Sequence, residues 1–240
     1  MVRVALVCQL IIGALKKPDK KHHLISVDEK TGIQALSRME ERAPNSKGKR
    51  KRMEFEYKRN GTICLIAAYE VGTGKIIHRY LNKNRKEADF LLFIQQTLEK
   101  YPPDHKITFL ADQLNTHMSA TLVEFVAQLI GYKGDLGVKG SSGILKNMET
   151  RKAFLEIESH RVRVIYTPKH CSWLNPVENW FAKLQRSVIK NGNFESVDKL
   201  EQAIIRFVDY YNKCLAKPLK WKFKGFSKEK VLANFKESKT

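Results

Sequence analysis

Three carboxylate residues stand at positions where a folded chain could hold them rigidly. Asp28 and Asp112 each follow a short apolar run, "HLISV" and "ITFLA", of the kind that forms a buried strand. Glu178 follows Asn175 by three residues, at the start of an amphipathic helical pattern. Magnesium prefers carboxylate oxygens, and a pair of such ions can drive phosphoryl transfer. The three residues therefore form a candidate metal site, with Asp28 as the carboxylate shared between two ions.

Each of these residues also has a simpler interpretation. Asp112 could end a strand and cap a turn, and Glu178 could form a capping box with Asn175 as the helix cap. Glu29 directly follows Asp28, so one of the two is expected to be solvated. The apolar alternation before this pair does not decide which carboxylate faces a site. Residue types and spacing alone leave these alternatives open.

The charge of the chain indicates a polyanionic partner. Lysine and arginine number 44 against 25 acidic residues, which gives a formal net charge of +19. Nucleic acid is the commonest partner of such a protein, and a merely basic soluble protein is the alternative. Basic residues in exposed-looking segments could contact phosphates, or could simply be solvated. These candidates are Lys47, Lys49, Arg50, Lys51, Arg52, Lys139, Lys146, Lys183 and Arg186.

Cysteine usage and the N-terminal pattern favour a cytoplasmic protein without a membrane segment. The cysteines Cys8, Cys64, Cys171 and Cys214 are far apart and show neither zinc-ligand spacing nor a disulfide framework. That distribution fits a reducing compartment. The apolar run "ALVCQLIIGAL" is too short to span a bilayer, and no cleavage site follows it. A helix packed on the domain is expected there instead.

The elements that must position the carboxylates alternate between strands and helices. This order predicts an α/β fold, a mixed sheet with helices on both faces, whose ligand sites lie beyond the carboxyl ends of strands. Turns are expected at Asn60-Gly61 and at Gly72-Thr73-Gly74, and a loop at Ser37 to Arg52. Strands are expected at 22–28, within 53–81, at 105–113 and at 161–168; helices are expected within 85–101, at 119–131, 148–160, from 175 onward and at 196–212.

Three motifs together resemble the DDE transposases. They are "SVDEKTGIQAL", "FLADQLNTH" and "YTPKHCSWLNPVENWFAKLQR", and the resemblance is to the bacterial IS-six-thirty branch of the mariner-like superfamily. It extends from about Val7 to the "KPLKWKFKG" segment. The resemblance implies an RNase H-like catalytic domain that uses two Mg²⁺ ions, or Mn²⁺ as a substitute. It also implies that Asp28, rather than its neighbour, joins Asp112 and Glu178 as the metal-binding carboxylates.

The resemblance further implies an activity and partners. Such enzymes cut double-stranded DNA at element ends, and the freed 3′-hydroxyl attacks target DNA, usually at TA. The active form is expected to be a homodimer, because two ends must be joined. Two alternatives remain: another RNase H-like nuclease, such as a ribonuclease H or a resolvase, and a truncated, transposase-derived DNA-binding protein without activity.

The resemblance also divides the chain. Residues 1–20 are expected to be a linker-helix remnant, 21–225 the catalytic domain, and 226–240 a basic C-terminal tail. The 66 positions between Asp112 and Glu178 exceed the usual mariner-like spacing, which indicates an insertion at about 131–160. Family members carry helix-turn-helix modules before this domain, so a separate DNA-binding half is an expected partner. The protein is expected at the nucleoid, in a bacterial cytoplasm.

Two further residues near the motifs have open roles. His117 follows Asp112 by five positions, and could orient a carboxylate or substrate, or be structural. Trp173 lies five positions before Glu178. Its ring is expected to be buried as a hydrophobic staple of the helix, and stacking on a base is the alternative.

Overall fold

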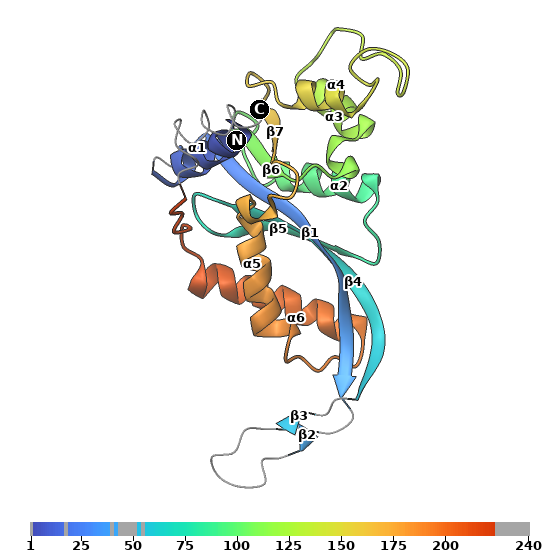
Figure 1. Cartoon of the computed structure of the whole chain (residues 1–240), viewed down its shortest axis with the longest axis vertical. Coiled ribbons are helices and arrows are strands. Elements are labelled where there is room, and N and C mark those ends of the chain that lie inside the picture. Colours follow the sequence, from blue (N-terminus) through green and yellow to red (C-terminus); the bar gives the residue numbers. More distant parts are fainter. Residues whose placement is uncertain (1, 17–18, 39–40, 43–51, 54–55, 224–240) are drawn as a thin grey trace, which may run out of the picture.

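A five-stranded mixed sheet forms the centre of the protein (Figure 1). The computed structural model describes residues 2–16, 19–38, 41–42, 52–53 and 56–223. The strand order is β5-β4-β1-β6-β7, antiparallel from β5 to β1 and parallel from β1 to β7. A separate two-stranded pair, β2 and β3, lies beyond the far end of β1. The strands are β1 (His22–Arg38), β2 (Glu41–Arg42), β3 (Arg52–Met53), β4 (Tyr57–Glu70), β5 (Ile76–Asn82), β6 (Lys106–Ala111) and β7 (Val162–Tyr166).

Helices cover both faces of the sheet, as the sequence predicts. One apolar core lies between the sheet and α1, α5 and α6; the other lies between the sheet and α2, α3 and α4. Burial of two faces explains why the parallel strands are almost continuously apolar. The α-helices are α1 (Val2–Lys16), α2 (Glu87–Leu98), α3 (Ala120–Leu129), α4 (Met148–Leu155), α5 (Val177–Leu184) and α6 (Val197–Tyr210). Shorter turns are η1 (Asn115–Met118), η2 (Ser172–Leu174), η3 (Gln185–Ile189) and η4 (Tyr211–Leu215).

Alternation along β1 sends neighbouring carboxylates to opposite faces of the sheet. Leu24 belongs to the core under α5, whereas Ile25 and Val27 belong to the core under α2 and α3. Successive strand side chains alternate, so Asp28 faces α5 and Glu29 faces the α2 side. Both are buried: Asp28 is 8% exposed, and the Glu29 side chain is 2% exposed. The expectation that one of this pair is solvated is therefore wrong.

The first strand is much longer than the sequence pattern predicts. The predicted strand ends at Asp28, but β1 continues to Arg38, so Asp28 lies in its middle. The extension pairs with β4, with register shifts on either side of Ile33 and Gln34. Ile33 and Ala35 are buried within it. Pairing with a strand distant in sequence overrides the polar composition that made this segment look like a loop.

The two predicted turns have different outcomes. Gly72 to Gly74 lies in the turn between β4 and β5, as predicted. Asn60-Gly61 lies inside β4, so the turn predicted there is wrong. The Asn60 amide donates to Ser37 Oγ and to the Phe194 carbonyl, both at 2.8 Å, and so joins β1 to the chain before α6. The apparent turn signal thus serves a tertiary contact.

The N-terminal helix, the predicted insertion and the predicted C-terminal tail differ in what the structure describes. Helix α1 contributes Val4, Val7, Cys8 and Ile11 to the core under α5 and α6. Residues 131–160 contain an ordered loop and α4, and the loop is anchored by the buried side chain of Leu145. The predicted tail 226–240 lies outside the described residues. No helix in the part of the chain that the structure describes is long and apolar enough to cross a membrane.

Candidate active site

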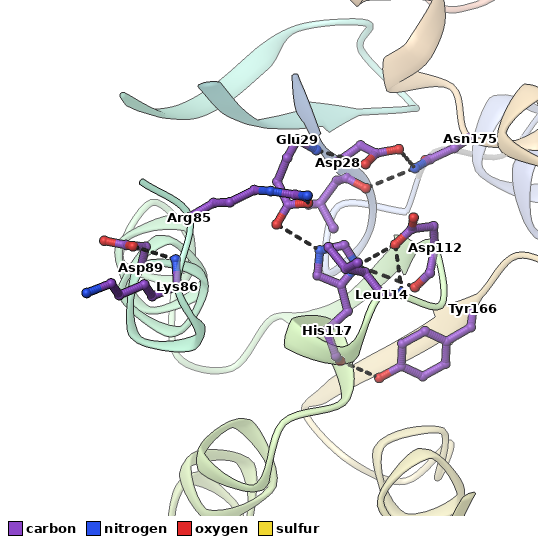
Figure 2. Close-up of polar contacts among 11 residues, drawn as sticks. Asp28, Glu29, Arg85, Lys86, Asp89, Asp112, Leu114, His117, Tyr166 and Asn175 are labelled. Carbon is purple, nitrogen blue, oxygen red and sulfur yellow. Dashed lines mark hydrogen bonds and ion pairs between the residues drawn. The ribbon is translucent and has the colours of Figure 1, made fainter. Parts of the chain in front are cut away.

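Three carboxylates from three elements influence one another at the centre of the sheet. Asp28 lies in β1, Asp112 directly follows β6, and Glu178 lies in the first turn of α5. Burial, then the negative charge of Asp112, and to a smaller extent that of Glu178, raise the pKa of Asp28 to about 7. Figure 2 shows Asp28 beside Asn175, and Asp112 beside His117. The charges of Asp112 and Glu178 thus act on Asp28, the carboxylate in the middle of β1.

Asn175 ties the start of α5 to β1. Its fully buried side chain donates to the Asp28 Oδ2 atom at 3.1 Å and to the Val27 carbonyl at 2.9 Å (Figure 2). Its own oxygen accepts a hydrogen bond from Ser26 Oγ, and Ser26 Oγ in turn accepts from the Val177 amide at 2.8 Å. These contacts fix the helix that carries Glu178 against the strand that carries Asp28.

The capping box, the alternative interpretation of Glu178, is not formed at the start of α5. The Asn175 side chain is committed to β1, and the residue at the helix cap is Pro176, which offers no side-chain cap. Burial raises the pKa of Glu178, the nearby Asp112 charge adds to this, and Lys30 opposes it. Because Glu178 has no capping partner in the described structure, its carboxylate is available to the cluster.

Replacement of Asn175 by Ala is expected to destabilise the fold by about 2–3 kcal/mol, because two buried acceptors and one donor lose their partner. Metal-dependent nicking should fall at least tenfold, since α5 is no longer fixed to Asp28. Asn212 provides a matched control, because its amide bridges Ile76 N and O at 2.9 and 2.8 Å, on the edge strand β5. Asn212→Ala should lose stability but retain nicking; equal nicking by both variants would remove Asn175 from the site.

Asp112 is held through one of its two oxygens. Asp112 Oδ1 accepts from the His117 ring at 2.7 Å and from the Leu114 amide at 3.0 Å. Within the described residues, no hydrogen bond uses Asp112 Oδ2. Burial alone would raise the pKa of this carboxyl, but the hydrogen bond and charge of His117, the Leu114 amide and the charge of Arg85 together outweigh it, and the pKa is lowered. Asp112 is therefore ionised and fixed, with one oxygen left for a ligand.

His117 and Glu29 are site residues whose roles the sequence did not settle. The fully buried His117 ring lies between Asp112 and Glu29, with its Nε2 atom 3.3 Å from Glu29 Oε1 (Figure 2). Arg85 approaches the second Glu29 oxygen at 3.1 Å. Burial opposes the charge on His117, but its bonds to Asp112 and Glu29 prevail and raise its pKa to about 9. Two features of the sequence could have pointed to these residues: the acidic pair at 28–29 and the histidine five positions after Asp112.

The donor chemistry of the cluster fits a divalent cation. Within the described ranges, no three His, Cys, Asp or Glu side chains are gathered closely enough to hold a metal ion together. The charges of Asp112 and Glu178 nevertheless raise the pKa of Asp28, and a nearby cation would relieve that repulsion. Hard carboxylate oxygens are the ligands that Mg²⁺ and Mn²⁺ favour. Asp28, Asp112 and Glu178 are the residues that would hold such an ion.

Two of the candidate DNA contacts lie on the helix that carries Glu178 and its continuation. Lys183 stands over the ring of Tyr211, with its nitrogen 5.2 Å from the ring centre, and Arg186 is exposed. Burial, followed by the charges of Lys217 and Arg186, lowers the pKa of Lys183. Lys183 and Arg186 therefore place positive charge along α5 and η3, and the charge of Lys217 also reaches Lys183.

The remaining candidate DNA contacts are dispersed. Lys139 and Lys146 are exposed on the segment before α4, and Lys139 Nζ lies 3.9 Å from Glu87 Oε2. Arg52 belongs to β3, where it pairs with Arg42. The other four lie outside the described residues: Lys47, Lys49, Arg50 and Lys51.

The expected burial of Trp173 is wrong. Its ring is 48% exposed, and it contacts the edge of Phe223 with ring centres 5.2 Å apart. Leu174, the next residue in the short turn η2, is fully buried in the core instead. The tight turn directs these neighbouring side chains differently, so the apolar role falls to Leu174.

Comparisons with known proteins identify a family and a fold for this chain. A family model described as DDE superfamily endonuclease matches residues 23–201. The fold is similar to that of the Mos1 strand transfer complex (TM-score 0.54, 13% identity, covering 89% of this chain and 54% of that chain). It is also similar to the Mos1 mariner paired end complex with Mn (TM-score 0.54, 13% identity, covering 88% and 56%). The shared fold is an RNase H-like mixed sheet. The chain spans about half the length of these structures, and no curated protein matches it.

Proposed function

Because the chain belongs to the DDE superfamily of endonucleases, we propose that it catalyses metal-dependent cleavage of DNA as a transposase. The observation that carries this proposal is the hydrogen bond from Asn175, just before the helix of Glu178, to Asp28, whose pKa the charges of Asp112 and Glu178 raise. Three acidic side chains held by two strands and a helix suit phosphodiester chemistry better than acyl transfer, which needs an activated nucleophile.

The side chains of this site have distinct tasks in the proposed reaction. Asp28, Asp112 and Glu178 would hold a divalent cation, which would supply positive charge for activating the attacking oxygen and stabilising the leaving oxygen. Asn175 orients Asp28 through its Oδ2 atom, and His117 orients Asp112 through its Oδ1 atom. Lys183 and Arg186 provide positive charge for the phosphate backbone along the helix that carries Glu178 and its continuation. Rigid positioning then supplies the rest of the rate enhancement.

The finer features of the proposal rest on the family resemblance that the three sequence motifs carry. They comprise membership of the IS-six-thirty branch, two ions, strand transfer by a freed 3′-hydroxyl, and insertion at TA. They also comprise a homodimer on double-stranded DNA, a separate helix-turn-helix half, and a bacterial cytoplasmic location at the nucleoid. The Mn-containing complex of Mos1 mariner supports divalent metal use, and its paired ends support a DNA-joining role. Lys139, Lys146 and the basic run 47–52 are proposed as additional phosphate contacts.

Nicking of supercoiled DNA tests this function. Wild-type protein should nick the plasmid in Mn²⁺ or Mg²⁺, and EDTA should stop the reaction. Asp112→Asn should be inactive under the same conditions, and joined products should form when an element end is supplied. Equal nicking by wild type and variant would contradict the proposal. Cleavage of an RNA–DNA hybrid without DNA nicking would identify a ribonuclease H instead.

A further inference from the structure

A chain of alternating charges runs through the protein to the candidate site (Figure 2). It begins at Arg85, continues through Glu29 and His117, and ends at Asp112, with contacts of 3.1, 3.3 and 2.7 Å. The side chains of the two middle members are 2% and 0% exposed, whereas those of the outer two are 42% and 40% exposed. The buried carboxylate of Glu29 thus lies between two basic side chains, Arg85 and His117.

The His117 ring is fixed from several directions. Each ring nitrogen faces a carboxylate oxygen, so both nitrogens donate and the ring cannot flip without losing a contact. The Phe90 ring packs against it, with ring centres 4.2 Å apart. The hydroxyl of Tyr166 donates to the His117 carbonyl at 2.7 Å and holds its backbone. The histidine is therefore a rigid support.

This support reaches Asp112 through a single oxygen. The His117 ring and the Leu114 amide both donate to Asp112 Oδ1, which restrains rotation of the carboxylate. Asp112 Oδ2 has no hydrogen-bond partner among the described residues. We propose that His117 and Glu29 are positioning residues that hold Asp112 so that Oδ2 is presented to the metal; this rests on the function proposed above. Groups that orient metal ligands in this way commonly influence metal affinity as much as activity.

Glu29 is the member through which positioning can be tested apart from Asp112. It has no contact with Asp112 and acts through the ring of His117. Glu29→Gln keeps the size of the side chain but removes its negative charge, so the contact to the second nitrogen of the His117 ring is weakened and the ion pair to Arg85 is lost. Asp112 then keeps its own chemistry but is held less firmly.

Glu70 offers a matched control at the other end of the sheet. Its carboxylate is also buried beside a histidine, with His23 Nδ1 2.8 Å from Glu70 Oε1. No recorded contact joins this pair to Asp28, Asp112 or Glu178 in the described structure. Glu70→Gln therefore makes the same chemical change in the same kind of pair, away from the candidate site.

The experiment measures Mn²⁺ binding by electron paramagnetic resonance, DNA affinity, nicking and thermal unfolding for each variant. Glu29→Gln should bind Mn²⁺ about 10–100-fold more weakly than wild type, with DNA affinity within about twofold. Glu70→Gln should bind Mn²⁺ as wild type does, even where its unfolding temperature falls. If Glu29→Gln does not fold, Arg85→Gln replaces it in the experiment, because the Arg85 side chain is half exposed. Loss of Arg85 should weaken Mn²⁺ binding severalfold.

The outcomes separate the two proposals. The positioning role alone would be overturned if Glu29→Gln bound Mn²⁺ as tightly as the wild type. If Glu29→Gln is unfolded, the same result for Arg85→Gln would overturn it. Equal weakening in Glu29→Gln and Glu70→Gln would do the same, because it would reflect general destabilisation. If wild-type protein neither binds Mn²⁺ nor nicks DNA, the proposed function fails and the positioning role fails with it.

Discussion

Exchange of Asp28 for Asn is expected to lower metal-dependent nicking by about 10³-fold, equivalent to about 4 kcal/mol of transition-state stabilisation. The reason is that Asp28 is the carboxylate coupled to both Asp112 and Glu178, and an amide oxygen is a much weaker ligand for a divalent ion. The assay is plasmid nicking in Mn²⁺. Asp198→Asn, an exposed change at the start of α6, is the control and should leave nicking unchanged.

The same substitution is expected to stabilise the metal-free protein at neutral and higher pH. The pKa of Asp28 is raised to about 7 in the folded state from an ordinary value of 3.8, so the folded state retains a proton that the unfolded chain releases. The stability associated with this group is fully present below pH 4 and is lost as the pH rises through 7. The amide introduced by Asp28→Asn carries no charge, so the variant should avoid that loss of stability. This gain is reduced by about 1 kcal/mol, because the amide cannot make one of the hydrogen bonds of the carboxylate.

Unfolding of both proteins in EDTA between pH 4 and 8 measures this effect. The free energy of unfolding of the variant should rise relative to that of the wild type by about 3–4 kcal/mol between pH 4 and pH 8, since each unit of pKa shift corresponds to about 1.4 kcal/mol. Adding Mn²⁺ should stabilise the wild type and reverse the order. A difference between the two proteins that stays constant across the pH range would contradict the burial and repulsion inferred for Asp28.

Replacement of His117 by Ala is expected to destabilise the fold by about 3–5 kcal/mol, because Glu29 is left buried with one of its two cationic partners missing. Loss of the ring also leaves a cavity beside Phe90. The free energy of unfolding in urea measures the loss. His78→Ala is the control: His78 is half-buried beside Phe93 and bonds the neutral Gln96, so about 1 kcal/mol is expected.

The effect of His117→Ala should depend on pH. The pKa of His117 is raised to about 9 from an ordinary 6.5, so its stabilising charge is fully present below pH 6.5 and is lost as the pH rises through 9. The difference between variant and wild type should therefore be largest near pH 6 and smaller near pH 9.5. A difference that increases with pH would show that the ring is neutral in the folded protein.

The sequence by itself determined the order of the main helices and strands, and its motifs single out three carboxylates by resemblance to a family. Local signals were sufficient for helices such as α3 and α6, whose predicted starting residues Ser119 and Ser196 act as side-chain caps. Their hydrogen bonds reach three residues along the chain, so the pattern is contained in a short window. The same holds for the alternation of apolar runs that predicts a sheet covered on two faces.

The tertiary structure alone decided how the carboxylates are supported. Asn175 looks like a helix cap within its own segment, but its side chain bonds Asp28, 147 positions earlier. Glu29 looks like a surface residue, but β1 continues past it and His117, 88 positions later, packs against it. A buried polar group must find a partner wherever the fold brings one, and that requirement depends on contacts no short window contains. Short sequence motifs are thus enough to single out the carboxylates, whereas the contacts that support them depend on the fold.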